Sequence, residues 1–399
     1  MGHSFLTLPP LSLYIHIPWC VKKCPYCDFN SHTFESLPEK EYLSALIADL
    51  NHDLPYIQNR EIISIFFGGG TPSVLSAEFY HELLLYLREH VNLSESLEVT
   101  LEANPNSSES DRFHGYLKAG INRLSIGVQS FQPHYLNTLG RAHTEKEAHQ
   151  AIEMAKSAGF SQFNIDLMYG LPNQSIEEAM LDLKTALSFS PTHLSWYQLT
   201  IEPNTYFYRY PPKDLPIEDT IIEMEEAGYL LLEKGDLGRY EVSAYAKEQS
   251  QARHNLNYWQ FGDYLGIGAG AHSKITLLET DNIIRFSKTR MPKDYLSAVT
   301  KLNLNSNNTS NPFALAKEIV SPELRSGEFL MNALRLKAGF DVRLFKERTG
   351  ISLETIWPQL QYFSTQNLIE YDGHILKATE RGYTLLNSLL GAFLDIPSN

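Results

Sequence analysis

The strongest constraint on the fold is the alternation of two patterns in the first half of the chain. Short apolar runs recur six times, and longer stretches with apolar residues three and four positions apart lie between them. Strands that alternate with helices form βαβ units and therefore a parallel sheet. We predict an α/β fold, either a partial (β/α)6 barrel or a doubly wound sheet. The six runs cover residues 12–17, 63–67, 97–103, 122–129, 163–170 and 193–200.

Polar or glycine-rich positions fall at or near the ends of these runs. The sequence GGGTP (68–72) follows the second run, Glu102 and Gln129 belong to the third and fourth, and Asp166 lies within the fifth. The carboxyl ends of parallel barrel strands share one face, and that face builds the active site. The sequence therefore predicts one site at this mouth.

All three cysteines of the chain, Cys20, Cys24 and Cys27, lie in a loop just after the first run. Structural zinc normally takes four protein ligands, and His16 or His32 could supply the fourth. A four-iron cluster usually takes four thiolates as well. Three thiolates leave one iron open to an exchangeable molecule. The spacing is thus compatible with a reactive cluster or with a Cys3His zinc site.

Composition excludes several classes of protein. A formal net charge of −14 argues against a general nucleic-acid binder, which needs a basic surface. No apolar run is long enough to span a membrane, and three clustered cysteines do not suit a secreted disulfide scaffold. We expect a cytoplasmic protein. Peripheral contact with the inner face of the membrane is left open.

The second half of the chain predicts a small separate domain. Residues 301–312 are polar and rich in Asn and Ser, which is typical of a linker. Helix-like stretches follow, and then 367–379 with an Asp-Gly turn typical of a hairpin. The expected division is 1–300, a linker at 301–312, and a winged-helix-like α+β domain at 313–399. Residues 311–399 carry nine basic and ten acidic residues, so we expect no DNA-reading role.

Several motifs together resemble one enzyme superfamily. The spacing C-x3-C-x2-C after a first strand, followed one strand later by GGGTP, resembles the radical S-adenosylmethionine (SAM) proteins. From about residue 11 to the C-terminus, the chain is similar to oxygen-independent coproporphyrinogen III oxidases and to the related HemW-type haem chaperones. The resemblance rests on YIHIPWC, GGGTP, LEANP, SIGVQSF, LGRAHT and IDLMYGLP. It implies a partial (β/α)6 radical SAM barrel with a small C-terminal winged-helix-like domain.

The resemblance also implies ligands for two cofactors. It assigns Cys20, Cys24 and Cys27 to a [4Fe-4S] cluster. It places Tyr26 near the adenine of SAM, and it puts the glycine motif with Tyr14 and Glu102 beside the SAM bound to the cluster. Positions matching a second SAM in the oxidases are also present. The full set implied for SAM is Tyr14, Tyr26, Gly69, Gly70, Thr71, Glu102, Gln129, Arg141 and Asp166.

Two departures separate the chain from the oxidases. Phe29 stands where the oxidases have a fourth cysteine, and few residues precede Tyr14. Both features are similar to the HemW-type chaperones, which bind haem and deliver it. We therefore expect haem transfer and no coproporphyrinogen decarboxylation, with the oxidase activity as the alternative.

The stretch HNLNYW (254–259) is the other motif that separates the two branches, and it resembles the haem chaperones. His254 could ligate haem iron, with Tyr258 and Trp259 offering flat apolar surface to the macrocycle. His272 is a second candidate ligand. A histidine among aromatic rings is also commonly a packing residue. The expected partners are haem as cargo and haem-accepting proteins, with membrane respiratory enzymes among the candidates. No nucleic-acid partner is expected, and a homodimer is left open.

Overall fold

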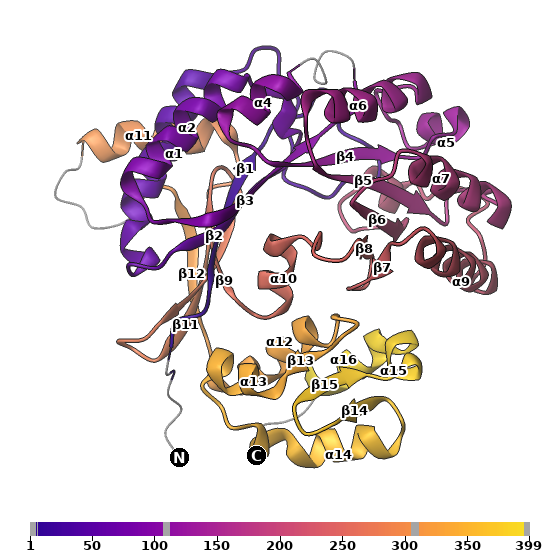
Figure 1. The fold of residues 1–399 in the computed structure, drawn as a ribbon. Coiled ribbons are helices and arrows are strands. Elements are labelled where there is room, and N and C mark those ends of the chain that lie inside the picture. The colour runs from indigo at the N-terminus through magenta and orange to yellow at the C-terminus, as the bar shows by residue number, and fades with distance from the viewer. Residues whose placement is uncertain (1–4, 6, 107–111, 305–310, 395–399) are drawn as a thin grey trace.

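The computed structural model describes residues 5, 7–106, 112–304 and 311–394. Six parallel strands follow one another in sequence order across a curved sheet (Figure 1). This confirms the predicted α/β barrel class and rules out the doubly wound order. The parallel strands are β1 (Leu11–Ile17), β2 (Ile62–Gly69), β3 (Leu93–Ala103), β4 (Arg123–Gln129), β5 (Gln162–Tyr169) and β6 (His193–Gln198).

The helices that connect these strands lie on the outer side of the curved sheet (Figure 1). Their apolar stripes face the strands, and capping boxes at Thr144 and Ser175 fix the starts of two of them. Leu13 and Ile15 of β1 have no exposed surface, as expected for a strand covered on both faces. The connecting helices are α1 (Glu39–Asp53), α2 (Ala77–His90), α4 (Phe113–Ala119), α5 (Pro133–Thr138), α6 (Glu145–Ala158) and α7 (Ile176–Ser188).

The sheet continues beyond both ends of the six parallel strands, which the sequence did not predict. On one side β9 (Asp263–Ile267) pairs parallel with β1, and three antiparallel pairings extend the sheet to β12. On the other side β8 (Ala244–Ala246) pairs antiparallel with β6. The other added elements are β7 (Gly238–Arg239), β10 (His272–Leu277), β11 (Asn282–Lys288), β12 (Ala314–Val320), α8 (Tyr206–Arg209), α9 (Glu218–Lys234), α10 (Arg253–Trp259) and α11 (Pro292–Leu304).

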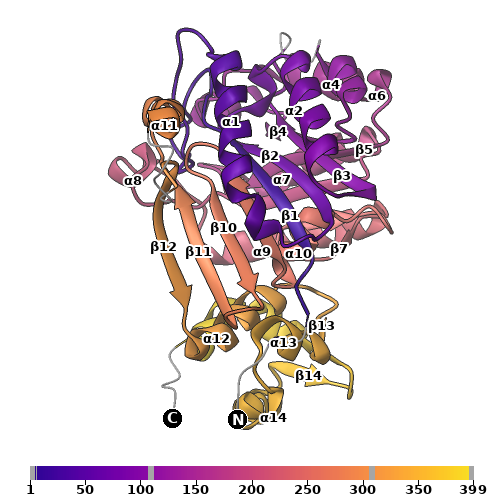
Figure 2. The ribbon, with the colours of Figure 1, turned by 90° about the vertical axis from the view of Figure 1, so that its left-hand side faces the viewer.

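The C-terminal region packs against the lower end of this extension (Figure 2). It has its own three-stranded sheet, whose β14–β15 pair is the hairpin predicted around the Asp-Gly turn. Its elements are α12 (Pro322–Ala333), β13 (Phe340–Asp341), α13 (Val342–Thr349), α14 (Trp357–Thr365), β14 (Ile369–Tyr371), β15 (Ile375–Ala378), α15 (Glu380–Thr384) and α16 (Leu386–Leu394). No helix in the described ranges is long and apolar enough to cross a membrane.

The predicted linker, residues 301–312, overlaps a helix at its start and is closely followed by a strand. Helix α11 runs through residues 301–304, residues 305–310 lie outside the described residues, and residues 314–320 form β12. Strand β12 pairs with β11 and so belongs to the main sheet, although the expected division assigned it to the small domain.

A buried ionic cluster ties the sheet extension to the helical layer. Lys288 at the end of β11 bonds the carboxylates of Asp49 and Asp53, and all three side chains have no exposed surface. Tyr295 of α11 donates a hydrogen bond to Asp49 at 2.7 Å. These contacts hold α1, β11 and α11 together beside the barrel mouth.

Candidate functional site

The cysteine loop is closed by backbone pairing at its two ends. The Cys20 amide donates to the carbonyl of His32 at 3.0 Å, and the His32 amide donates to Pro18 at 2.7 Å. Within the loop, a turn brings the Cys27 amide 3.1 Å from the Cys24 carbonyl. The loop therefore starts at the end of β1 and its far end, at His32, returns to the same place. The three cysteines lie between these paired ends.

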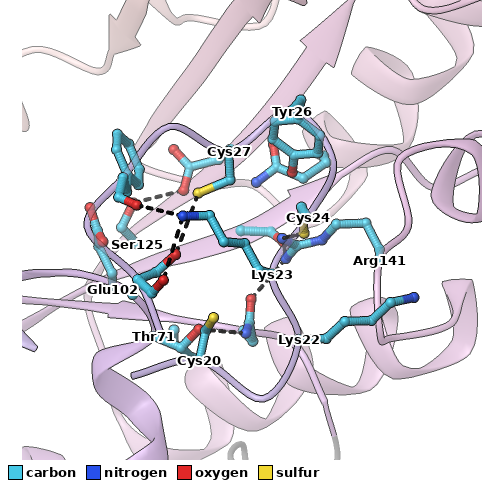
Figure 3. A pocket seen from close by; sticks show the side chains of 18 of the residues that line it. Cys20, Lys22, Lys23, Cys24, Tyr26, Cys27, Thr71, Glu102, Ser125 and Arg141 are labelled. Atoms are coloured by element: carbon cyan, nitrogen blue, oxygen red, sulfur yellow. Dashed lines mark hydrogen bonds between the residues drawn. The ribbon is translucent and has the colours of Figure 1, made fainter. Parts of the chain in front are cut away.

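The three thiols are free and line one cavity of about 350 Å³ at the barrel mouth (Figure 3). Burial raises the pKa of the Cys20 and Cys27 thiols above their ordinary range. The Lys23 side chain extends across the cavity and donates to the Phe29 carbonyl at 3.1 Å. Its positive charge near Cys20 and Cys27 opposes that rise and favours the thiolate forms.

The thiols do not converge on a single point with either candidate histidine. His16 Nε2 lies 2.8 Å from the Asn30 carbonyl, and His32 Nε2 lies 3.2 Å from the Asn30 Oδ1. Among the described residues, no three His, Cys, Asp or Glu side chains are grouped closely enough for one metal ion. Three spaced thiols around a hollow suit a polynuclear cluster better than the zinc alternative.

The glycine turn packs directly against the cysteine loop. The amides of Gly70 and Thr71 donate to the carbonyls of Ile17 and Trp19, both at 2.7 Å. A Cβ on Gly70 would lie 2.4 Å from the Trp19 oxygen. The bare backbone is thus required by contact with Trp19, and not only by the approach of a ligand. Gly70 and Thr71 still line the thiol cavity.

Two carboxylates stand inside the barrel next to the thiols. Burial and the nearby Asp166 raise the pKa of Glu102 to about 8, although the Gly69 amide donates to it at 3.3 Å. Burial also raises the pKa of Asp166, against the hydrogen bonds from Ser125 and Asn164. Both carboxylates line the cavity and can accept from a ligand's hydroxyl or ammonium groups.

Arg141 contacts both the cysteine loop and residues on the opposite side of the cavity. Its guanidinium donates to the Cys24 Sγ at 3.5 Å, to the Asn104 Oδ1 at 2.8 Å and to the Gly127 carbonyl at 2.6 Å. Its Nε is buried and has no hydrogen-bond partner among the residues that the structure describes. Although burial opposes its charge, Tyr26 and Cys24 hold the pKa of Arg141 above its ordinary range. This unused donor indicates a position for an anionic or carbonyl group.

Other predicted SAM residues divide between two cavities. Tyr26 and Gln129 line the thiol cavity, and Gln129 has a φ of 71° and accepts from the Tyr197 hydroxyl at 2.7 Å. Tyr14 and Gly69 line the adjoining cavity instead. There Tyr14 lies 3.0 Å from His16 Nδ1.

The adjoining cavity has a volume of about 510 Å³ and contains most of the predicted haem residues. His254 and Tyr258 reach it from one face of α10, and His272 reaches it from the start of β10. Trp259 is not among its lining residues and stacks instead beneath Arg335. Phe29 and Glu102 line both cavities, so they form the partition between them.

His254 is held as a neutral imidazole. Burial lowers its pKa to about 4, and its Nδ1 lies 3.2 Å from the Ser64 Oγ. No hydrogen bond to its Nε2 is found among the described residues. A neutral imidazole with one nitrogen engaged and the other unused is the form that ligates a metal.

Several lining residues were not predicted from the sequence. Arg290 and Asp28 line the second cavity. Asp28 directly follows Cys27 but was not singled out, and Arg290 lies outside any motif. Position near the cysteines could have indicated Lys23, and position directly after the third run could have indicated Asn104. Ser125 lies within β4, where no such signal marks it. The polar and aromatic lining residues that were missed are Lys22, Lys23, Asp28, Asn30, Ser31, Asn104, Ser125, Ser195, Tyr197, Ser243, Tyr264 and Arg290.

Known families match both parts of this arrangement. The Radical SAM superfamily profile matches residues 14–185, and the HemN C-terminal domain profile matches residues 320–385. The "Heme chaperone HemW" of Haemophilus influenzae is 48% identical over 97% of this chain and 98% of its own length. The chain belongs to the HemW family. The Escherichia coli protein of the same name is 46% identical over 97% of this chain and 99% of its own.

The HemW fold also matches a solved structure. Coproporphyrinogen III oxidase (HemN) from Escherichia coli, described as a radical SAM enzyme, superposes with a TM-score of 0.79 at 22% identity. The match covers 97% of this chain and 91% of that one. At this identity it establishes the shared fold alone, and the HemW assignment comes from the sequence relatives.

Proposed function

We propose that this protein is a haem chaperone that holds a [4Fe-4S] cluster, SAM and haem, and that it passes haem to acceptor proteins. The observation that carries the proposal is the pair of adjoining cavities. One is lined by three thiols and two buried carboxylates, and the other by three histidines and several aromatic rings. The HemW relatives, named for haem, support the second assignment.

In this proposal Cys20, Cys24 and Cys27 ligate the cluster, which has one iron left free for SAM. A cluster of this kind supplies a coordination position for SAM and an electron when it is reduced. Arg141 donates to the Cys24 Sγ and so helps to keep that side chain in place. Glu102 and Asp166 accept hydrogen bonds from SAM, and the Arg141 guanidinium binds its carboxylate.

The second cavity is the proposed haem site. His254 presents a neutral ring, and Tyr14 and Tyr258 provide flat surface for the macrocycle. Phe29, which is 57% exposed, separates the macrocycle from the thiols. Since Phe29 has no thiol, we do not expect this protein to decarboxylate coproporphyrinogen III.

The proposed place of action is the cytoplasm, including the inner face of the membrane when the acceptor is a membrane protein. Haem is the cargo, and the acceptors are apoproteins that ligate haem. Transfer requires that the haem site open to solvent, and the exposed His272 and Phe29 at its edge provide such an opening.

The test is anaerobic reconstitution with iron and sulfide, followed by haem titration. We expect brown protein with about four irons, and then a saturable Soret shift at one haem per chain. Cys24→Ala should lose most of the cluster absorbance, because two thiolates rarely hold four irons. His254→Ala should weaken haem binding with the cluster intact. Colourless wild-type protein, or haem binding without saturation, would contradict the proposal.

A further inference from the structure

The second cavity contains very little fixed charge. Burial lowers the pKa of His16 and of His254 to about 4, and it also lowers that of His272, so these rings are neutral near pH 7. Glu102 has a raised pKa of about 8 because of burial and Asp166, so its neutral form dominates there as well. Asp28 and Arg290 supply the remaining carboxyl group and the one guanidinium among the described lining residues.

The backbone that carries Arg290 is fixed to the cysteine loop. Asn30 donates from its Nδ2 to the Arg290 carbonyl at 2.8 Å and to the Ala269 carbonyl at 2.9 Å. The Gly270 amide donates to the Thr289 carbonyl at 2.9 Å. Two residues before Arg290, the Lys288 side chain is bound to buried carboxylates. The base of the Arg290 side chain is therefore held in one place at the rim.

These contacts engage the backbone around Arg290 and leave its guanidinium free to bind a ligand. It is exposed, and none of its nitrogens has a hydrogen bond or an ion pair in the described part of the chain. Asp28 lies at the same rim and is also exposed, yet the two side chains form no ion pair. An arginine fork at the edge of an apolar, aromatic cavity suits a flat ligand with a carboxylate at one edge.

We propose that Arg290 binds a carboxylate arm of the tetrapyrrole, so that the second cavity selects macrocycles with free propionates and fixes their orientation. This inference rests on the proposed haem function. The propionate edge lies at the rim, where the charged arms stay in contact with water, and the opposite edge points inward to Tyr14 and Gly69. Burying the propionates instead would cost their solvation without a partner inside.

The experiment compares haem with its dimethyl ester, which lacks free carboxylates, on the cluster-loaded full chain. Wild type should bind haem roughly tenfold more tightly than the ester. Arg290→Ala should weaken haem to the level of the ester and leave the ester unchanged. Arg290→Lys should keep part of the preference because it retains charge without the fork. Arg209→Ala, which removes an exposed arginine of α8 that does not line the cavity, is the matched control.

Two further measurements separate this contact from iron ligation. Metal-free protoporphyrin IX should show the same acid-over-ester preference, and His254→Ala should not change that ratio. Asp28→Asn should tighten the acid and not the ester, because it removes a like charge from the rim.

The outcomes of the two proposals are distinguishable. Absence of saturable haem binding by wild type would overturn the haem function itself. Haem binding with equal affinity for acid and ester, or an equal loss of both in Arg290→Ala, would overturn the role of Arg290 alone.

Discussion

At the scale of single residues, the site depends on burying ionisable groups beside one another. Glu102 illustrates the cost, since burial and Asp166 raise its pKa from 4.5 to about 8. A carboxyl group that is more basic in the folded protein binds more protons there than in the unfolded chain. Its contribution to stability is therefore complete below about pH 4.5 and is lost as the pH rises through about 8.

We therefore expect Glu102→Gln to change how the stability of the ligand-free protein depends on pH. Relative to wild type, the variant should gain unfolding free energy as the pH rises from 5 to 9, on the order of a few kcal/mol. Thermal unfolding across that range measures the difference. Glu61→Gln, at an exposed position, is the control. A constant difference between Glu102→Gln and wild type at all pH values would contradict the assignment.

Site residues that belong to a recognisable motif could be predicted from the sequence, whereas residues outside any motif could not. The three cysteines, Glu102, Gln129 and Asp166 line one cavity, and their positions in or just after the apolar runs had pointed to that face. Arg141 lines it too, and only the family resemblance had indicated it. Arg290 lies in a turn between β11 and α11, and nothing local in TRMP marks it as part of a site. Only the pairing of distant strands brings it beside the cysteine loop.

At the scale of elements, α10 is the wall on which the proposed haem site depends. It presents His254 and Tyr258 to the second cavity, while Asn255 lines a separate polar cavity inside the barrel. Asn257 anchors the helix from beneath, donating to the Ser12 Oγ and to the Asp263 carbonyl, both at 2.9 Å. A helix of seven residues is marginal without such tertiary contacts.

Asn257→Ala should loosen α10 without touching either cavity directly. Loss of two buried hydrogen bonds predicts a decrease of about 1–3 kcal/mol in stability. Hydrogen exchange over residues 253–259 should become faster, and haem affinity should fall. Asn92→Ala, at an exposed position, serves as the control. Unchanged protection of α10 would show that Asn257 does not hold it.

Elements with a strong local pattern were predicted well, and those defined by distant pairing were not. The six apolar runs became β1 to β6, each within a few residues of the expected bounds. Strand β9 ends within the glycine-rich GIGAGA and β10 begins just after it, a stretch whose glycines disfavour strands. They form because β9 pairs with β1, more than two hundred residues earlier in the chain.

At the scale of the whole molecule, the barrel and its extension are joined through buried charges as well as through the sheet. Lys288 lies between Asp49 and Asp53, and these carboxylates belong to α1 on the helical side. Burial opposes the charge of Lys288, but the two carboxylates raise its pKa above the ordinary range. Removal of this cation leaves two neighbouring buried carboxylates without the lysine's compensating charge.

Lys288→Met should therefore destabilise the fold by about 3–5 kcal/mol, far more than an exposed lysine would. Chemical denaturation measures the loss, and Lys317→Met on the neighbouring β12 is the matched exposed control. Equal small effects for both variants would show that the ionic cluster is not needed for stability.

The bridging amide of Asn30 has a consequence for the order in which the ligands assemble. It fastens the loop that receives the iron to the turn that presents Arg290, and the same residue's carbonyl is bonded by His16. In the proposed function, a movement of that loop when the metal enters is passed to the guanidinium at the rim. Metal insertion and tetrapyrrole binding would then be coupled, and we expect the metal-free chain to present a differently arranged entrance to haem.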